Sequence, residues 1–203
     1  DMCSVILLRR PDAIWPLVVA ANRDEMSGRP WQPPARHWPD RPEIVAGLRS
    51  DLYPPLAEVA NRWNDAMGIE VRYPADHAAF VRRCHKAGQT KPTALMLQYG
   101  PGDYNCLHQD LYGEHVFPLQ AAFLLDQPGE DFEGGEFVLV EQRPRQQSAP
   151  QVVPLTKGQG VIFAVRERPH QGARLHRRVL RHGVSEVRSG RRRVLGVIFH
   201  DAA

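Results

Sequence analysis

Apolar residues recur at spacings of three and four positions after Leu52, a period that is typical of an amphipathic helix. Gly68 ends this pattern, because glycine commonly follows the last helical residue. A second helix is expected from Asp76, whose short carboxylate suits the position before a first helical turn, to Ala87, with Gly88 as its end. Neither segment carries obvious catalytic side chains, so both are expected to support a sheet. The inward-facing residues are expected to be Leu56, Val59, Ala60, Trp63, Met67, Ala79, Phe80 and Cys84.

After Pro92 the pattern changes to short apolar runs, rich in Val, Ile, Leu and Phe and separated by Gly, Pro or Asp. Such runs are typical of β-strands. Many short strands behind two helices predict a mainly β fold with flanking helices, arranged as a sandwich or an open barrel. The expected strands are 94–99, 119–125, 136–141, 152–155, 160–165, 182–187 and 193–200.

The first part of the chain has a different pattern. Residues 3–8 and 16–21 are apolar runs separated by a breaker at Pro11, so two strands joined by a turn are expected. Residues 29–47 then contain five prolines and two tryptophans, a composition unsuited to regular helix or central strand. We interpret this stretch as a linker or surface strap and expect a domain boundary near residues 46–49.

Length and composition limit the class of protein. At 203 residues, with 42% hydrophobic and 24% charged residues, the chain has globular composition and suffices for one domain, or one domain with an extension. No apolar run approaches the roughly 20 residues of a membrane span, and the N-terminal segment lacks the pattern of a secretory signal. Cys3, Cys84 and Cys106 form no CxxC pair, so neither a disulfide framework nor a zinc ribbon is indicated. A soluble protein of the reducing cytoplasm is the expectation.

Positive charge is concentrated late in the sequence. The net charge is +3, yet residues 164–203 hold ten arginines against Glu167, Glu186 and Asp201, which gives +7 there and −4 elsewhere. A solvated arginine-rich surface is the simplest interpretation. An anionic cosubstrate and a nucleic-acid backbone are the alternatives.

The segment YGPGDYNCLHQD, from Tyr99 to Asp110, contains the most informative chemistry. In extended chain His108 and Asp110 leave the same face and can bind one metal ion, while Gln109 points away. His182, on a later expected strand, supplies a second imidazole. Two imidazoles and one carboxylate on one face of Fe(II) leave three coordination positions open, which is the facial-triad arrangement of non-haem oxygenases. Taken singly, each residue is also explained as a polar side chain satisfied within a β-sandwich.

Arg192 is the candidate anchor for an acidic cosubstrate. If residues 188–190 formed a three-residue hairpin loop with Gly190 in the left-handed conformation, His182 and Arg192 would share a face about 13 Å apart. That gap suits a five-carbon diacid lying between metal and guanidinium, whose planar fork matches the distal carboxylate.

The segments YGPGDYNCLHQD, DFEGGEF and HGVSEVRSGRR together resemble the Fe(II)- and 2-oxoglutarate-dependent dioxygenases over about residues 50–203. The spacing from His182 to Arg192 is similar to the prolyl-hydroxylase-like branch, whereas Tyr99 nine positions before His108 is similar to the AlkB-type branch. The resemblance implies a double-stranded β-helix core of the jelly-roll or cupin type. It also implies that Tyr99 and Arg192 bind 2-oxoglutarate.

The resemblance includes one departure. Members of the family normally have further core strands before the helix that resembles LYPPLAEVANRW, and here a different segment occupies that position. An incomplete N-terminal edge of the sheet is therefore expected, unless residues 3–21 supply the missing strands.

Residues 1–47 resemble the start of the NRDE family, also called the TANGO2 family, in MCSVILLRR, LVVAANRDE, RPWQPP and PEIVAG. In that family the cysteine after the initiator methionine invites comparison with N-terminal-nucleophile hydrolases. Here Asp1 and Met2 precede Cys3, and a small buried cysteine is the ordinary expectation. We therefore divide the chain into an NRDE-like fragment with its linker, residues 1–47, and an oxygenase domain, residues 48–203.

Together these features predict a dioxygenase in which His108, Asp110 and His182 hold Fe(II), and 2-oxoglutarate is converted to succinate and CO2 while an unidentified substrate is hydroxylated. Fe(II), 2-oxoglutarate and O2 are the expected cofactors, with ascorbate as an optional reductant. A protein side chain is the favoured substrate, with a small acid or an alkylated base in nucleic acid as alternatives. No membrane is expected, and the oligomeric state stays open. Two further hypotheses are an inactive metal-binding β-sandwich module and a thiol hydrolase or carrier centred on Cys3.

Several neighbouring residues have weaker assignments. Tyr104 and Asn105 are expected either to line the substrate entrance or to pack in the core, and His115 is expected in an exposed loop. The remaining candidates are arginines that can form a basic rim around the site, Arg174, Arg177, Arg178 and Arg181, and surface or strand-end histidines, His170, His176 and His200.

Overall fold

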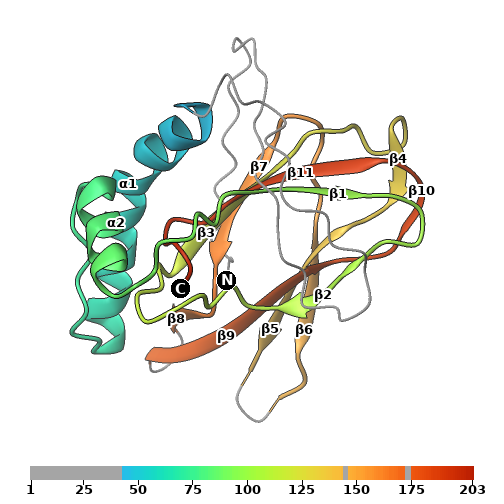
Figure 1. Ribbon diagram of the computed structural model, residues 1–203. Helices are drawn as coiled ribbons and strands as arrows, with labels where there is room; N and C mark the ends of the chain where they lie inside the picture. The colour runs from blue at the N-terminus through green and yellow to red at the C-terminus, as the bar shows by residue number, and fades with distance from the viewer. Residues whose placement is uncertain (1–42, 144–145, 172–174) are drawn as a thin grey trace.

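The computed structural model describes residues 43–143, 146–171 and 175–203, which form two helices and eleven strands (Figure 1). The strands and Cys3 expected before residue 43 lie outside these ranges. The helices are α1 (Glu43–Met67) and α2 (His77–Lys86). The strands are β1 (Leu95–Tyr99), β2 (Asn105–His108), β3 (Leu119–Leu124), β4 (Phe132–Gly134), β5 (Phe137–Gln142), β6 (Ala149–Val153), β7 (Gly160–Ala164), β8 (Glu167–Gln171), β9 (Leu175–Val184), β10 (Val187–Gly190) and β11 (Arg192–Val197).

Both predicted helices are present. α2 begins after Asp76, whose Oδ1 accepts the backbone N–H of Ala79 at 2.7 Å, and Gly88 follows it with a φ of +83°. α1 begins at Glu43, earlier than the apolar period alone indicates, so the expected boundary near residues 46–49 lies within a helix. The division into two domains stays a prediction, because residues 1–42 lie outside the described part of the chain.

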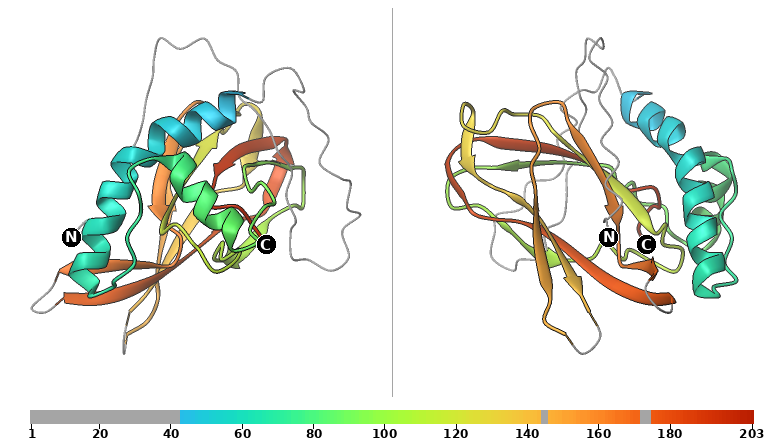
Figure 2. Two further views of the ribbon diagram at one scale, coloured as in Figure 1. Left: turned by 60° about the vertical axis from the view of Figure 1, so that its left-hand side comes forward. Right: turned by 180° about the vertical axis from the view of Figure 1, so that it is seen from behind.

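Two antiparallel sheets form the body of the molecule (Figure 2). The helix-backed sheet has the order β1-β11-β3-β7, and the ligand sheet has the order β2-β9-β5-β6, with β8 paired to the first half of β9. Four strands facing four strands in this order form a double-stranded β-helix, so the predicted fold class is confirmed. All eight core strands lie between Leu95 and Val197, and any edge strand supplied by residues 3–21 falls outside the described residues.

Apolar side chains fill two layers. The first lies between the helices and the helix-backed sheet, where the rings of Tyr53, Phe80, Phe117 and Phe199 contact one another. The second lies between the two sheets and contains Tyr99, Leu124, Phe132, Phe137, Leu139, Phe163, Val184, Val187 and Val194. The helices therefore support one sheet from outside, as expected, and leave the space between the sheets for the candidate site.

The hairpin predicted for residues 188–190 is wrong. β9 ends at Val184, β10 pairs with β4, and β11 belongs to the helix-backed sheet, so His182 and Arg192 lie on opposite sheets. Gly190 does have the expected positive φ, +78°, but a Cβ there would lie 2.2 Å from the carbonyl oxygen of Asp131 rather than in a free turn. Long-range pairing with β4 replaces the local turn that the spacing indicates.

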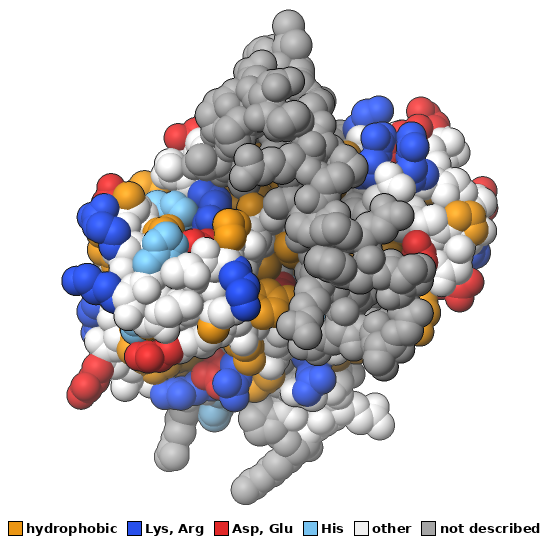
Figure 3. All heavy atoms as spheres, viewed as in Figure 1, with side chains coloured by type: hydrophobic (Ala, Val, Ile, Leu, Met, Phe, Trp, Pro, Cys, Tyr) orange, Lys and Arg blue, Asp and Glu red, His pale blue; other side chains and the backbone are white. Residues whose placement is uncertain are grey.

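The exterior carries mixed charge. On the face seen in Figure 3, Lys and Arg side chains lie among Asp and Glu side chains over the helix layer at its left-hand edge. Neither described helix has both the length and the apolar character needed to cross a membrane.

Candidate metal centre

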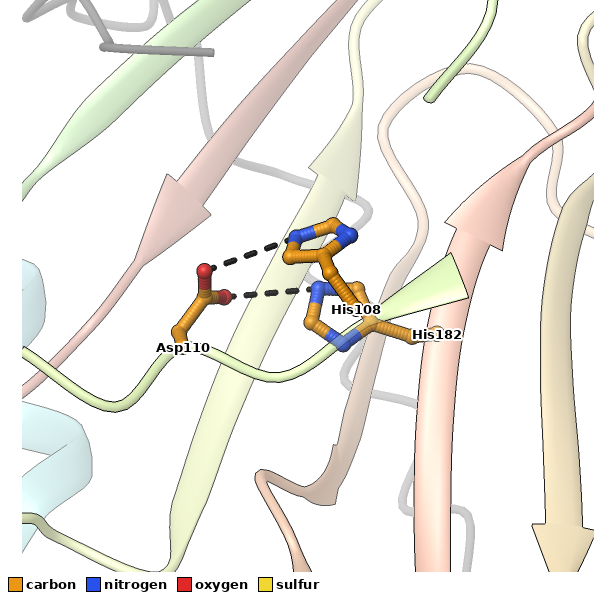
Figure 4. Close-up of side chains that lie close together, drawn as sticks. All are labelled: His108, Asp110 and His182. Atoms are coloured by element: carbon orange, nitrogen blue, oxygen red, sulfur yellow. Dashed lines mark ion pairs between the residues drawn. The ribbon is translucent and has the colours of Figure 1, made fainter. Parts of the chain in front are cut away.

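His108, Asp110 and His182 come together at one point between the sheets (Figure 4). His108 ends β2 and is the cross-strand partner of His182 in β9, and Asp110 follows two residues later. The ligand atoms of the three side chains all lie within 4.8 Å of one another. Asp110 Oδ1 lies 3.5 Å from His108 Nε2, and its Oδ2 lies 3.3 Å from His182 Nε2. Adjacent ligands of an octahedral metal with bonds near 2.1 Å are roughly 3 Å apart, so the spacing fits one ion.

A backbone carbonyl orients the His108 ring. His108 Nδ1 lies 2.7 Å from the carbonyl oxygen of Cys106, which can only accept, so Nδ1 carries the proton. The lone pair of His108 is therefore on Nε2, the nitrogen that faces Asp110. Its side chain is 28% exposed, so His108 is the most exposed of the three candidate ligands.

The protonation states at the site suit metal binding. Burial lowers the pKa of His182, although the Asp110 carboxylate opposes this effect. Burial raises the pKa of Asp110, but hydrogen bonds with His108 and His182 outweigh it and hold that pKa well below its usual range. The result is an ionised carboxylate beside a neutral imidazole, the forms in which these groups bind metals.

Two neutral donors fix the Asp110 carboxylate, and sequence analysis missed both. Tyr112 donates its hydroxyl to Oδ1 at 2.7 Å, and the buried amide of Gln120 donates to Oδ2 at 2.8 Å. Gln120 also lies 3.2 Å from His182 Nε2. Its only sequence signal is a lone amide within the otherwise apolar strand β3, LQAAFL.

The loop after Asp110 is fixed by Gln89, a fully buried residue that follows α2. Its amide nitrogen donates to the carbonyl oxygens of Tyr112 (3.2 Å), His115 (3.1 Å) and Asp201 (2.6 Å), and its Oε1 accepts the His115 N–H at 2.7 Å. The loop is therefore tied both to the helix layer and to the segment that follows β11.

Aromatic rings of one buried cluster contact both His182 and Arg192. Phe163 contacts His182 with a centroid distance of 4.8 Å and contacts Phe137 at 5.1 Å. In the same buried cluster, the Arg192 guanidinium lies 5.4 Å from the Tyr99 ring centroid and 6.0 Å from that of Phe132. Buried apolar surroundings lower the local dielectric constant, which strengthens any charge interaction made within them.

Arg192 is buried and forms no ion pair with a described residue, although the charges of Asp126 and Glu136 act on it from beyond ion-pair distance. It is 1% exposed, it pairs in register with Tyr99, and its Nε and Nη1 have no hydrogen-bond partner within the described chain. Burial lowers its pKa, yet a guanidinium stays charged. A buried, unpaired guanidinium is costly unless an anion binds there. The residue predicted as the cosubstrate anchor thus has two free donor atoms inside the barrel.

The other expected site residues have mixed outcomes. His115 is half-buried and not part of the triad, and Tyr104 is 37% exposed. His200 was expected at the surface or at a strand end, and the surface position is wrong because its side chain is fully buried. Its Nδ1 accepts the N–H of Phe117, and burial lowers the pKa of His200 to about 4. Arg174 lies outside the described residues.

Two family models match different parts of the chain. A family model described as an oxygenase "catalysing oxidative methylation of damaged DNA" matches residues 37–202, and a model described as "Transport and Golgi organisation 2" matches residues 2–52. An uncharacterized protein of Mycobacterium tuberculosis, present in strains CDC 1551 and H37Rv, is 48% identical over 161 residues, which cover 79% of this chain and 69% of that protein.

Two solved structures are more distantly similar. A 2OG-Fe(II) oxygenase family oxidoreductase from Burkholderia pseudomallei matches with 21% identity and a TM-score of 0.38 over 53% of this chain and 43% of its own. A Pseudomonas putida prolyl-4-hydroxylase matches with 16% identity and a TM-score of 0.37, and the match covers 73% of this chain and 78% of that one. Both TM-scores are below 0.5, so family membership depends on the family model that matches residues 37–202.

Proposed function

Because the chain belongs to the oxygenase family whose model matches residues 37–202, we propose that this oxidoreductase is a non-haem dioxygenase that uses Fe(II), 2-oxoglutarate and O2. The observation that carries the proposal is the convergence of His108, Asp110 and His182, with ligand atoms within 4.8 Å of one another. Two neutral imidazoles and one carboxylate are the donor set of a facial triad, which leaves three positions for cosubstrate and O2. Bound Fe(II) would supply the activation of O2 that protein side chains alone lack.

The residues of the barrel have separate roles in this proposal. Arg192 would bind the distal carboxylate of 2-oxoglutarate through its unpaired Nε and Nη1, with Tyr99 beside it. Gln120 and Tyr112 would keep Asp110 oriented, and Phe137 and Phe163 would exclude water from the space between anchor and metal. In this proposal ascorbate would act only as an external reductant.

The substrate we propose is an alkylated base in nucleic acid. The description of the matched family names damaged DNA, and this favours nucleic acid over the protein side chain that sequence analysis placed first. Hydroxylation of an N-methyl carbon replaces one C–H bond by C–OH, and the resulting hemiaminal releases formaldehyde and restores the base. Succinate and CO2 would form in equal amounts from 2-oxoglutarate.

Anaerobic titration of the protein with Fe(II) and then 2-oxoglutarate tests the cofactor assignment. We expect a weak visible charge-transfer band in the wild type and its loss in His108→Ala and Asp110→Ala. His115→Ala is the matched control, because it removes a nearby histidine that lies outside the triad. Folded wild-type protein that binds Fe(II) but gives neither the band nor succinate would instead support an inactive metal-binding module.

Arg192→Lys tests the anchor. Lysine keeps the charge but loses the planar fork, so 2-oxoglutarate should bind about 10- to 100-fold more weakly while Fe(II) affinity is retained. The exposed neighbour Arg191→Lys should leave both affinities unchanged. Equal 2-oxoglutarate affinity in all three proteins would refute the assigned role of Arg192.

A further inference from the structure

The loop that follows Asp110, residues 111–118, forms neither helix nor strand. Part of its backbone is hydrogen-bonded by a side chain from the helix layer. Gln89 Oε1 accepts the N–H of His115 at 2.7 Å, and Gln89 Nε2 lies 3.1 Å from the carbonyl oxygen of His115 and 3.2 Å from that of Tyr112. Because one amide contacts the backbone at both of these positions, the path of the loop depends on where that amide lies.

The end of α2 fixes the backbone of Gln89. Gly88 has a positive φ of +83°, and the N–H of Gln89 donates to the carbonyl oxygen of Cys84 at 3.0 Å. A left-handed glycine commonly ends a helix with a hydrogen bond of this kind. Two residues later, Lys91 and Ala202 exchange backbone hydrogen bonds of 3.0 and 2.8 Å. The chain is therefore held on both sides of Gln89.

The Gln89 side chain is also bonded to the segment that follows β11. Its Nε2 donates to the carbonyl oxygen of Asp201 at 2.6 Å. The Asp201 carboxylate in turn pairs with Arg49 of α1 and with His85 of α2, each at 2.9 Å. Since Gln89 is 1% exposed and hydrogen-bonded through both polar atoms of its side chain, its amide has little freedom to move.

Gly113 lets the loop pack closely against this amide. Its φ is +129°, and a Cβ at this position would lie 2.5 Å from Gln89 Cδ and 2.7 Å from Gln89 Cγ. A methyl group does not fit at these distances unless the loop or the amide moves. The loop backbone and Gln89 are therefore in direct contact, and a shift of one displaces the other.

Tyr112 connects the loop to a metal ligand. Its carbonyl oxygen faces Gln89 Nε2, and its hydroxyl donates to Asp110 Oδ1 at 2.7 Å. Gln89 thus holds the backbone of the residue whose side chain holds the carboxylate. A continuous path of contacts leads from the helix layer to Asp110.

We propose that Gln89 is a positioning residue of the metal centre and acts on the Asp110 carboxylate through Tyr112. This inference rests on the proposed function, because it takes His108, Asp110 and His182 to be the Fe(II) ligands. A ligand that is already oriented need not be ordered when the metal binds, and partners outside the ligand set commonly change metal affinity by about 10- to 100-fold.

A double-mutant cycle, measured by anaerobic calorimetric titration with Fe(II), tests the proposal. Gln89→Met keeps the length of the side chain but loses its hydrogen bonds, so Fe(II) should bind about tenfold more weakly. Tyr112→Phe should have a similar effect. If Gln89 acts through Tyr112, the double variant should bind Fe(II) about as well as Tyr112→Phe alone. A loss of about a hundredfold in the double variant, as expected from two independent effects, would overturn the proposal.

A spectroscopic measurement separates positioning from stability. The d–d absorption of Co(II) bound in place of Fe(II) depends on how its ligands are arranged, and Gln89→Met should shift these bands in the same direction as Tyr112→Phe. Leu56→Ala is the matched control, because it removes a buried side chain from the helix layer and should ease unfolding in urea without changing the spectrum. The same spectral shift in Leu56→Ala as in Gln89→Met would show that lost stability alone disturbs the site, and the proposal would fail.

Gly113→Ala displaces the loop without altering Gln89 itself, so it also tests the proposal if Gln89→Met does not fold. Fe(II) should bind about tenfold more weakly, and this loss should disappear when Tyr112 is already Phe. Gly158→Ala controls for a side chain at positive φ, because Gly158 has a φ of +81° and no described atom within 4 Å of an added Cβ. Wild-type Fe(II) affinity in Gly113→Ala would contradict the proposal.

The same samples distinguish this proposal from the cofactor assignment. The charge-transfer band with 2-oxoglutarate in the wild type, together with unchanged Fe(II) affinity in Gln89→Met, would overturn the positioning role and leave the dioxygenase assignment intact. Coupled effects of Gln89→Met and Tyr112→Phe on Fe(II) binding in a protein that never gives the band would support the positioning role and count against the dioxygenase. Folded wild-type protein that binds neither Fe(II) nor Co(II) would overturn both.

Discussion

The Asp110 carboxylate accepts hydrogen bonds on both of its oxygens from groups that are neither metal ligands nor charged. Tyr112 and Gln120 reach it from the following loop and from the opposite sheet. Partners of this kind set the orientation of a ligand and commonly change metal affinity when they are removed. They also make the position of Asp110 depend on both sheets.

Gln120→Leu should reduce Fe(II) affinity by about tenfold, because Leu keeps the volume but cannot donate to Asp110 Oδ2. Tyr112→Phe removes the matching bond to Oδ1 and should have a similar effect. Anaerobic calorimetric titration with Fe(II) measures both. Wild-type affinity in both variants, alongside lost binding in His182→Ala, would show that these donors do not orient the ligand.

The convergence of the candidate metal ligands could be predicted from sequence, whereas the residues that support them could not. His108 and Asp110 are close in the chain and share a face of extended structure, so a local rule brings them together. Gln120 acts across the space between two sheets. A single polar residue within an apolar strand indicates that its side chain has a hydrogen-bond partner. The sequence does not identify Asp110 as that partner, because the two residues meet only when the sheets pack together.

The corner between β4 and β5 is built from Gly134 and Gly135, both with positive φ. At Gly135 a Cβ would lie 2.7 Å from Arg192 Cδ and 2.9 Å from Val187 Cγ2. Glycine is needed at position 135 because it tolerates a positive φ. It is also needed because the Arg192 side chain lies where a Cβ would be. This corner therefore helps to place the predicted anchor.

Gly135→Ala should displace Arg192 and weaken 2-oxoglutarate binding by roughly tenfold, while Fe(II) affinity changes little. Gly158→Ala is the control, since Gly158 has a similar φ of +81° and no described atom within 4 Å of an added Cβ. Both variants should lose about 1 kcal/mol of stability from backbone strain. Equal 2-oxoglutarate affinity in the two variants would show that the space at Gly135 does not affect the anchor.

Elements with strong local signals were predicted, and elements defined by pairing were missed. α2 has a capping aspartate and a terminal glycine, β7 is a continuous apolar run, β3 is apolar apart from Gln120, and β11 is apolar after its two arginines. β2, β4, β8 and β10 are short or polar, and they exist because a partner strand supplies their hydrogen bonds. The predicted 188–190 hairpin failed for the same reason: β10 pairs with β4, which is far away in the sequence.

The helix layer is joined to the sheets through two tyrosines, of which Tyr53 is fully buried and Tyr73 is half-buried. Tyr73 donates its hydroxyl to the carbonyl oxygen of Val116 at 2.8 Å, and burial raises its pKa to about 12. Burial also raises the pKa of Tyr53, whose hydroxyl has no hydrogen-bond partner among the described residues. Because folding favours the neutral phenol, this stabilisation is complete below pH 10 and is lost as the pH rises from 10 towards 12.

Alkaline conditions should therefore weaken the packing of the whole molecule. Between pH 10 and 12 the free energy of unfolding of the wild type should fall by up to about 1.4 kcal/mol per pH unit for Tyr73 alone. Tyr73→Phe should show a shallower decline, measured by urea unfolding at pH 9, 10 and 11. Identical slopes in the two proteins would mean that Tyr73 ionises equally in the folded and unfolded states.

The pairing of His108 with His182 across two strands means that the unfolded chain has no metal site. By mass action, an ion that binds only the native state shifts the folding equilibrium, by about 2.7 kcal/mol at a free concentration 100 times its dissociation constant. For a protein of this size, that corresponds to a rise in melting temperature on the order of 5 °C. Anaerobic thermal melts with Fe(II) should show this rise in the wild type and not in Asp110→Ala, so occupancy of the site can be measured from heat denaturation without any substrate.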